Sequence, residues 1–138
     1  MVQQKNNKSP AYEFISILIN DEFFKSKRCL WGPKGKTFFA PNKKLSYQID
    51  FFDENDKIGI LYYTDYIHAC HNRYRDTDLI NIDGKEITAL EIRQRDEARK
   101  KYMEEEYGIK LYIVWEGDYL NNKEKTIKEL FNKIMEDI

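Results

Sequence analysis

The sequence predicts an α/β fold, arranged as an α/β/α sandwich with a central mixed β-sheet flanked by helices. Three observations predict it. Apolar residues recur at helical spacing near both ends of the chain, in Phe14–Leu18 and Ile127–Ile134. A two-stranded pattern covers Leu45–Tyr63, and Lys110–Trp115 is the clearest strand, rich in β-branched and aromatic residues. The order helix, strands, helix, strand, helix places the last strand in the sheet beside the hairpin.

Length and composition indicate a globular protein. The chain has 138 residues with 10 Tyr and 8 Phe, enough for one core but not two, so we expect a single domain over residues 9–138 after a flexible tail, 1–8. No apolar run approaches the roughly 20 residues that span a bilayer, and no signal-like leader opens the chain. We therefore expect no membrane contact and a cytoplasmic location. Cys29 and Cys70 lack metal-ligand spacing, which predicts free thiols.

Charge is distributed unevenly along the chain. Residues 1–50 carry nine Lys or Arg against four acids, a local charge of +5, and the remainder carries 14 against 20, or −6. A basic half can attract nucleic-acid phosphates, although ordinary solvated surfaces also show such an imbalance. The expected phosphate contacts are the cations of one loop: Lys25, Lys27, Arg28, Lys34, Lys36, Lys43 and Lys44. A merely solvated loop is the alternative.

The first elements follow from local signals. Ser9-Pro10 predicts a helix start, with Ser as the N-cap and Pro at the first helical position, and the helix should run to about Phe23. Glu13 lies in its first turns, where an acid is also favoured by the helix dipole alone. A short strand is predicted at Thr37–Phe39.

The predicted hairpin contains a candidate site residue. Its first strand, Leu45–Phe52, alternates so that Asp50 lies mid-strand on the face opposite the apolar set. An acid with such neighbours is costly to ionise unless it is paired or binds a metal, and both roles are open. Asp53–Asp56 predicts the turn, and Ile58–Tyr63, apolar on both faces, predicts a central strand.

The second half of the chain supplies another acid. Asn72–Lys85 predicts a long loop with a turn at Asp83-Gly84, followed by a helix from near Thr88 to Gly108. Ile92, Asp96, Arg99 and Met103 share one stripe of this helix, so Asp96 should face inward. A buried pair of Asp96 with Arg93 or Arg99 is the alternative. The strand ending at Glu116–Asp118 precedes a last helix after Asn122.

Four residues, in order, resemble a known pattern. They are Glu13 in the first helix, Asp50 in Tyr-Gln-Ile-Asp-Phe-Phe, His68 in Thr-Asp-Tyr-Ile-His-Ala and Asp96 in Arg-Gln-Arg-Asp-Glu-Ala-Arg. Together with Gly-Ile-Lys-Leu-Tyr-Ile-Val-Trp-Glu, residues 108–116, they make the chain from Ser9 onward similar to the very short patch repair endonucleases and phage homing endonucleases. These enzymes form a Vsr-like branch of the PD-(D/E)XK nuclease superfamily.

The resemblance implies a restriction-endonuclease-like fold and a metal-dependent hydrolase of DNA phosphodiester bonds. Asp50 would hold Mg²⁺ or Mn²⁺ with the backbone carbonyl of Thr64, while Glu13 would act through metal-bound water. His68, oriented by Asp96, would deprotonate the attacking water. Tyr66 and Arg73 would join the basic loop in binding DNA. A bacterial or phage-infected host cell is the expected setting.

The chain also departs from these relatives. Leu61 and Tyr63 stand where the wider superfamily has its second acid and lysine, and Thr64 and Ile67 replace a Gly and a Trp of the branch. Two cysteines with His71 do not rebuild the zinc site of the repair enzymes, so no structural zinc is expected.

Three functional hypotheses remain open. A nicking, homing or repair-type endonuclease ranks first; its expected partners are DNA and either a second copy of the chain, as a homodimer, or a separate specificity partner. A catalytically weak nuclease fold that binds nucleic acid or protein is the second. A structural interaction protein, in which all four polar residues are coincidental, ranks last.

Overall fold

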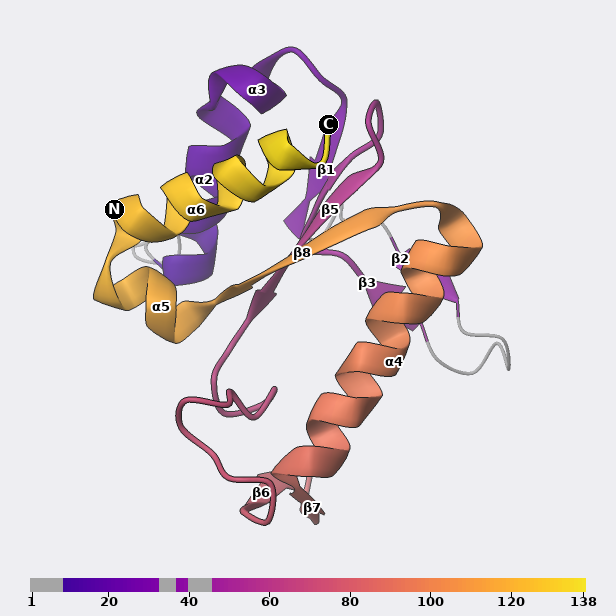
Figure 1. Cartoon of the computed structure of the whole chain (residues 1–138), viewed down its shortest axis with the longest axis vertical. Helices are drawn as coiled ribbons and strands as arrows, with labels where there is room; N and C mark the ends of the chain where they lie inside the picture. The colour runs from indigo at the N-terminus through magenta and orange to yellow at the C-terminus, as the bar shows by residue number, and fades with distance from the viewer. Residues whose placement is uncertain (1–8, 33–36, 40–45) are drawn as a thin grey trace, which may run out of the picture. The chain divides into compact units, whose positions relative to one another are not determined.

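The computed structural model describes residues 9–32, 37–39 and 46–138. Its helices and its mixed β-sheet confirm the predicted α/β character (Figure 1). The described chain groups into two compact units. The first unit holds the described residues up to Tyr62 together with Gly108–Tyr112, and the second holds Tyr63–Tyr107 and Ile113–Ile138. The expectation of one domain stays a prediction.

Two helices open the first unit. Helix α2 (Pro10–Asn20) begins as predicted: Ser9 is the N-cap, and its Oγ accepts a backbone hydrogen bond of the first turn at 3.2 Å. The predicted extension to about Phe23 is wrong. Asp21 caps a separate short helix, α3 (Glu22–Lys25), by accepting a hydrogen bond from the backbone of its first turn at 2.9 Å.

The main sheet has the strand order β1-β4-β5-β8. Its strands are β1 (Cys29–Trp31), β4 (Phe51–Asp53), β5 (Ile58–Tyr63) and β8 (Lys110–Trp115). β4 is antiparallel to both β1 and β5. The last strand of the chain therefore joins the sheet beside the hairpin strand β5, as the sequence predicts.

The first predicted strand, by contrast, divides into two. β3 (Ser46–Gln48) pairs with β2 (Thr37–Phe39) in a separate antiparallel ribbon, and β4 starts only at Phe51. Asp50 thus lies in a bend between two strands, and its predicted place in mid-strand is wrong. The assignment of Asp53 to the turn is also wrong, because this residue belongs to β4 and pairs with Ile58.

The central strand β5 is packed on both faces, as predicted. All six of its residues are buried. Gly59 is the closest point: a Cβ there would lie 2.6 Å from Leu111 Cδ2 and 3.1 Å from Ile49 Cγ2. An added methyl group would displace the Leu111 side chain from its packed position, which favours glycine at residue 59.

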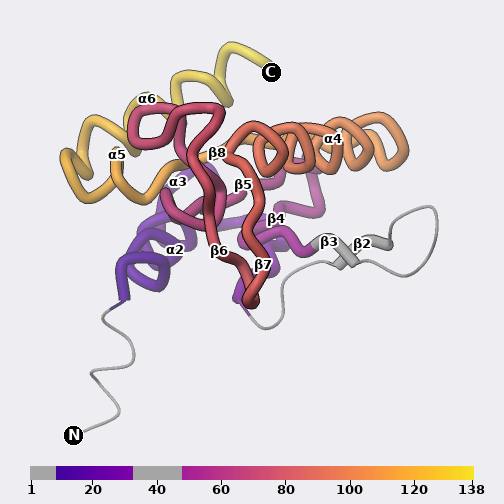
Figure 2. Tube along the Cα trace, turned by 90° about the horizontal axis from the view of Figure 1, so that it is seen from below, coloured from indigo at the N-terminus to yellow at the C-terminus, as the bar shows by residue number. Residues whose placement is uncertain are grey.

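In the second unit a β-hairpin replaces the predicted loop. β6 (Leu79–Ile82) and β7 (Lys85–Thr88) run side by side, as Figures 1 and 2 show. The turn at Asp83-Gly84 was predicted, and both residues have positive φ, +52° and +83°. Two such residues favour the tight hairpin turn that matches strand twist. The hairpin packs its apolar side, with Ile80 buried, against the start of the next helix.

Helix α4 (Ala89–Tyr107) follows the hairpin and confirms the predicted helix. Thr88 and Glu91 form a reciprocal capping box, in which Thr88 Oγ1 accepts from Glu91 N at 3.2 Å and Glu91 Oε1 accepts from Thr88 N at 3.2 Å. Gly108, with φ +66°, follows its end. Asp96 is buried on the predicted inward stripe, together with Ile92 and Met103.

Two helices close the second unit. α5 (Glu116–Asn121) was not predicted, since Glu116–Asp118 reads as a strand end. α6 (Lys123–Glu136) confirms the predicted last helix, and Asn122 caps it by accepting a hydrogen bond from Lys125 N at 3.1 Å. Within the described ranges, no helix combines the length and apolar character needed to cross a bilayer.

Candidate functional site

The second unit brings His68 and Asp96 together. Nδ1 of the imidazole lies 2.7 Å from Asp96 Oδ2, and the side chains are 23% and 8% exposed. An ionised carboxylate only accepts hydrogen bonds, so Nδ1–H is the donor. The neutral imidazole then carries its lone pair on Nε2, the tautomer that a general base needs. One of the alternative partners of Asp96, Arg93, bonds to other residues instead.

Aromatic rings hold the imidazole plane. Tyr63, the last residue of β5, stacks on His68 with ring centroids 3.8 Å apart and planes only 9° from parallel. Trp115, at the end of β8, contacts the Tyr63 ring edge-to-face at 5.3 Å. Such contacts add about 0.5–1.5 kcal/mol beyond area burial. The His68 ring is therefore fixed both by its hydrogen bond and by its stacked face.

In the first unit, the Asp50 side chain is hydrogen-bonded to the backbone near the end of β5. Its Oδ2 accepts a hydrogen bond from the Tyr62 backbone N–H at 2.8 Å, and the residue is half-buried. The bend between β3 and β4 thus presents the carboxylate to the backbone of β5. Glu13 is half-buried in the first turn of α2. Of the four predicted catalytic residues, Glu13 and Asp50 belong to the first unit, and His68 and Asp96 to the second.

Whether the described residues could bind Mg²⁺ depends on the oxygen ligands that they offer. Within residues 9–32, 37–39 and 46–138, no three His, Cys, Asp or Glu side chains gather as a metal cluster. Mg²⁺ does not require a cluster of three protein side chains, because it keeps several water ligands and is commonly bound by one or two carboxylates. Asp50 and Glu13 are hard oxygen donors of that kind. The Thr64 carbonyl already accepts a hydrogen bond from His68 N at 3.2 Å, and a carbonyl has a second lone pair.

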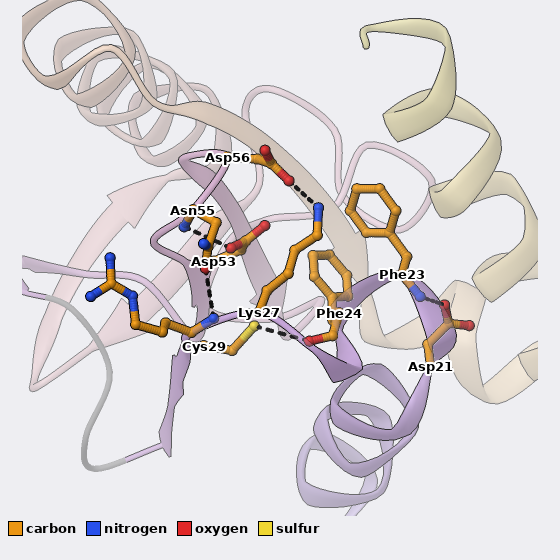
Figure 3. A network of polar contacts seen from close by, with 9 residues as sticks. Asp21, Phe23, Phe24, Lys27, Cys29, Asp53, Asn55 and Asp56 are labelled. Atoms are coloured by element: carbon orange, nitrogen blue, oxygen red, sulfur yellow. Dashed lines mark hydrogen bonds and ion pairs between the residues drawn. The ribbon is translucent and has the colours of Figure 1, made fainter.

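Three of the predicted DNA-binding cations lie around one hollow of the first unit. Lys25, Lys27 and Arg28 line this hollow, which has a volume of about 470 Å³ and an apolar part formed by Phe24, Leu30 and Trp31. Lys27 forms an ion pair with Asp56, and its Nζ lies 3.9 Å from the centroid of the Phe23 ring (Figure 3). The remaining cations of that set, Lys34, Lys36, Lys43 and Lys44, lie outside the described residues.

The two other predicted DNA contacts are exposed in the second unit. Tyr66 is 44% exposed, and its hydroxyl accepts a hydrogen bond from Asn81 N at 2.9 Å. The Arg73 side chain is 62% exposed and lies 3.6 Å from Asp65 Oδ2. Both are therefore accessible from solvent while being held at one end by a neighbour.

Sequence reasoning missed the most buried acid, Asp53. This residue is fully buried in β4, where Oδ1 accepts from Asn55 N at 2.9 Å and Oδ2 has no hydrogen-bond partner among the described residues. Burial raises the pKa of its carboxyl above the usual range. Burial, reinforced by the Asp53 charge, also raises the pKa of the facing Cys29 thiol to about 11. Both cysteines are free thiols, as predicted.

Comparison of the chain with protein-family models, with curated proteins and with solved structures gives no match.

Proposed function

We propose that this protein is a metal-dependent endonuclease that hydrolyses phosphodiester bonds in DNA. The observation that carries the proposal is the His68–Asp96 pair, whose 2.7 Å hydrogen bond leaves Nε2 of a half-buried, stacked imidazole as a proton acceptor. The four polar residues in the order Glu, Asp, His, Asp, and the similarity to Vsr-like nucleases that they carry, support the same activity. The finer fold, a restriction-endonuclease-like α/β/α sandwich, belongs to this proposal.

In the proposed reaction, His68 takes a proton from the water that attacks the phosphate. Asp96 stabilises the imidazolium that forms, because the carboxylate already accepts the Nδ1–H bond and is shielded from solvent. Nε2 receives the proton without any change in the Asp96 contact. Positioned acid–base groups of this type contribute about 10²–10⁴ in rate.

The proposed metal is Mg²⁺ or Mn²⁺. Asp50 would hold it together with the Thr64 carbonyl, and Glu13 would contact it through water. When bound, such an ion polarises the phosphate and stabilises charge on the attacking and leaving oxygens. The Tyr62 N–H fixes one oxygen of the Asp50 carboxylate at 2.8 Å, so the ligand side chain is oriented before any ion binds.

The test is cleavage of supercoiled plasmid and of short duplexes with Mg²⁺, Mn²⁺ or EDTA. We expect metal-dependent cutting by the wild type and a loss of at least about 100-fold in rate in Asp50→Ala and His68→Gln. His71→Gln and Asp83→Asn are matched controls, because they change the same residue types at exposed positions. Cutting that survives both site substitutions would reject the proposed site and indicate a contaminant.

One observation favours a second candidate, a nuclease-fold module that binds nucleic acid without cutting it. The hollow lined by Lys25, Lys27 and Arg28 includes one acidic residue, Glu54, so it retains a net positive charge. This candidate predicts DNA binding in EDTA that Asp50→Ala leaves unchanged, with no cutting by any form. A fluorescence-anisotropy titration beside the cleavage assay distinguishes the two functions.

A further inference from the structure

His68 lies on a turn that requires external support. Within the turn, His68 N donates to Thr64 O at 3.2 Å and Cys70 N donates to Asp65 O at 2.9 Å. The next residue, Ala69, has φ +51°, a region that L-residues with a Cβ seldom adopt. A strained backbone persists only where its surroundings determine it. Contacts from outside the turn must therefore hold Ala69, the residue next to the proposed base His68.

The main contact is the guanidinium of Arg93 on α4. Its Nε donates to Ala69 O at 2.8 Å, its Nη2 to Tyr74 O at 2.7 Å, and its Nη1 to Asp76 Oδ1 at 2.6 Å. The side chain is only 13% exposed. A planar guanidinium presents donors in a fixed arrangement, so three acceptors on it are held at fixed relative positions. Arg93 thus ties both ends of residues 69–76 to the helix.

Arg93 and Asp96 are three residues apart on α4 and so project from neighbouring positions of one helix. Asp96 binds the His68 ring, and Arg93 binds the carbonyl of the residue directly after His68. We propose that Arg93 is a positioning residue, which fixes the backbone of the turn so that the His68 ring reaches Asp96. This inference rests on the proposed function, in which His68 is the general base.

A second contact secures the opposite end of the turn. Asp65 Oδ1 accepts the Gly117 backbone N–H at 3.0 Å. A Cβ at Gly117 would lie 2.3 Å from Asp65 Oδ2, so only glycine allows the carboxylate to approach this closely. The turn is therefore held on both sides of His68, by Arg93 after it and by Asp65 before it.

The experiment measures the His68 ring directly. The chain has only two histidines, so in a His71→Gln background all imidazole signals in ¹⁵N NMR come from His68. We expect one slowly exchanging Nδ1–H proton, lost in Asp96→Ala, which removes both acceptor oxygens. Arg93→Gln should lose or broaden it, while Arg93→Lys, which offers a single charged centre to three acceptors, retains it in part. Arg75→Gln is the matched control, because that side chain is 89% exposed.

Cleavage kinetics provide the second readout. Arg93→Gln should lower kcat by about 10- to 100-fold with little change in KM, since a displaced base affects the chemical step. If Arg93→Gln does not fold by circular dichroism, Arg93→Lys and Gly117→Ala carry the test, and both should weaken the ring signal. An unchanged signal in folded variants, or its absence in the wild type, overturns the inference. A protein that cuts no DNA but whose signal depends on Arg93 overturns the proposed nuclease and leaves the positioning role.

Discussion

At the scale of single residues, the structure separates two acids that look alike in the sequence. Asp50 was expected to be costly to ionise among aromatic neighbours, yet it is half-buried and hydrogen-bonded to Tyr62 N. Asp53, read as a turn residue, is the acid that is fully buried. The difference arises because β4 begins at Phe51, after Asp50 and before Asp53. The alternation of apolar and polar residues over Leu45–Phe52 does not determine where one strand ends and the next begins.

The buried Asp53 predicts a pH dependence of stability. Burial raises its pKa in the folded protein above the unfolded value of about 3.9. The folded state therefore binds the proton more tightly, and the free energy of unfolding falls as pH rises from that value through the raised pKa. Asp53→Asn keeps the Oδ1 acceptor but removes the charge. Its stability advantage over the wild type should be larger at pH 7 than at pH 3.

Urea denaturation across this pH range measures the difference. The exposed Asp83→Asn variant is the control and should show no such trend. A stability difference for Asp53→Asn that stays constant from pH 3 to pH 7 would contradict the assignment of a raised pKa to this carboxyl.

The environment of a single residue could be predicted where it depends on a local sequence pattern. Asp96 was placed on the inward stripe by helical spacing alone, and it is buried there. The three acceptors of Arg93 lie 17 to 24 residues away along the chain, on a turn whose path depends on Ala69 at positive φ. No local pattern encodes such a contact, so the sequence offered Arg93 only as an alternative partner of Asp96.

At the scale of elements, capping signals were the most reliable. Residues next to each helix predicted where α2 and α4 begin and that α4 ends before a glycine. The β6–β7 hairpin was missed although its turn was recognised, because its strands have only four residues each and β7 is largely polar. Their stability comes from packing Ile80 against α4, a tertiary contact that strand propensity does not report.

The capping box of α4 gives a prediction at this scale. Thr88→Ala removes the Oγ1 that accepts from Glu91 N, and should cost about 1 kcal/mol of stability. Hydrogen bonds from Thr88 lower the pKa of the Glu91 carboxyl, so this part of the cap is present above the unfolded pKa and is lost as pH falls through the lowered value. The cost of Thr88→Ala should therefore shrink below about pH 4.

Thermal or urea unfolding of Thr88→Ala at pH 7 and pH 3 tests this expectation. Thr77→Ala, at an exposed position outside any helix or strand, is the matched control and should change stability by less than about 0.5 kcal/mol. A larger cost at pH 3 than at pH 7 would argue against the reciprocal cap.

At the scale of the whole molecule, the proposed reaction requires residues from both compact units. Asp50 and Glu13 belong to the first unit, and His68 and Asp96 to the second. Within the first unit Tyr62 N–H binds Asp50, and within the second unit Tyr63 stacks on His68. The order of motifs along the sequence predicts a joint role for these residues, and kinetics can test it.

The test is a double substitution in the cleavage assay. If Asp50 and His68 act as one unit, removing either one disables that unit, and the double variant Asp50→Ala/His68→Gln should cut about as slowly as the slower single variant. Two independent roles would instead multiply, so that two 100-fold losses give a loss of about 10⁴. Single-turnover rates on one duplex with Mg²⁺ measure all four forms, and Asp83→Asn/His71→Gln should cut within about twofold of the wild type. Multiplicative losses would mean that the two residues contribute independently of one another, and the proposed joint action of Asp50 and His68 would have to be abandoned.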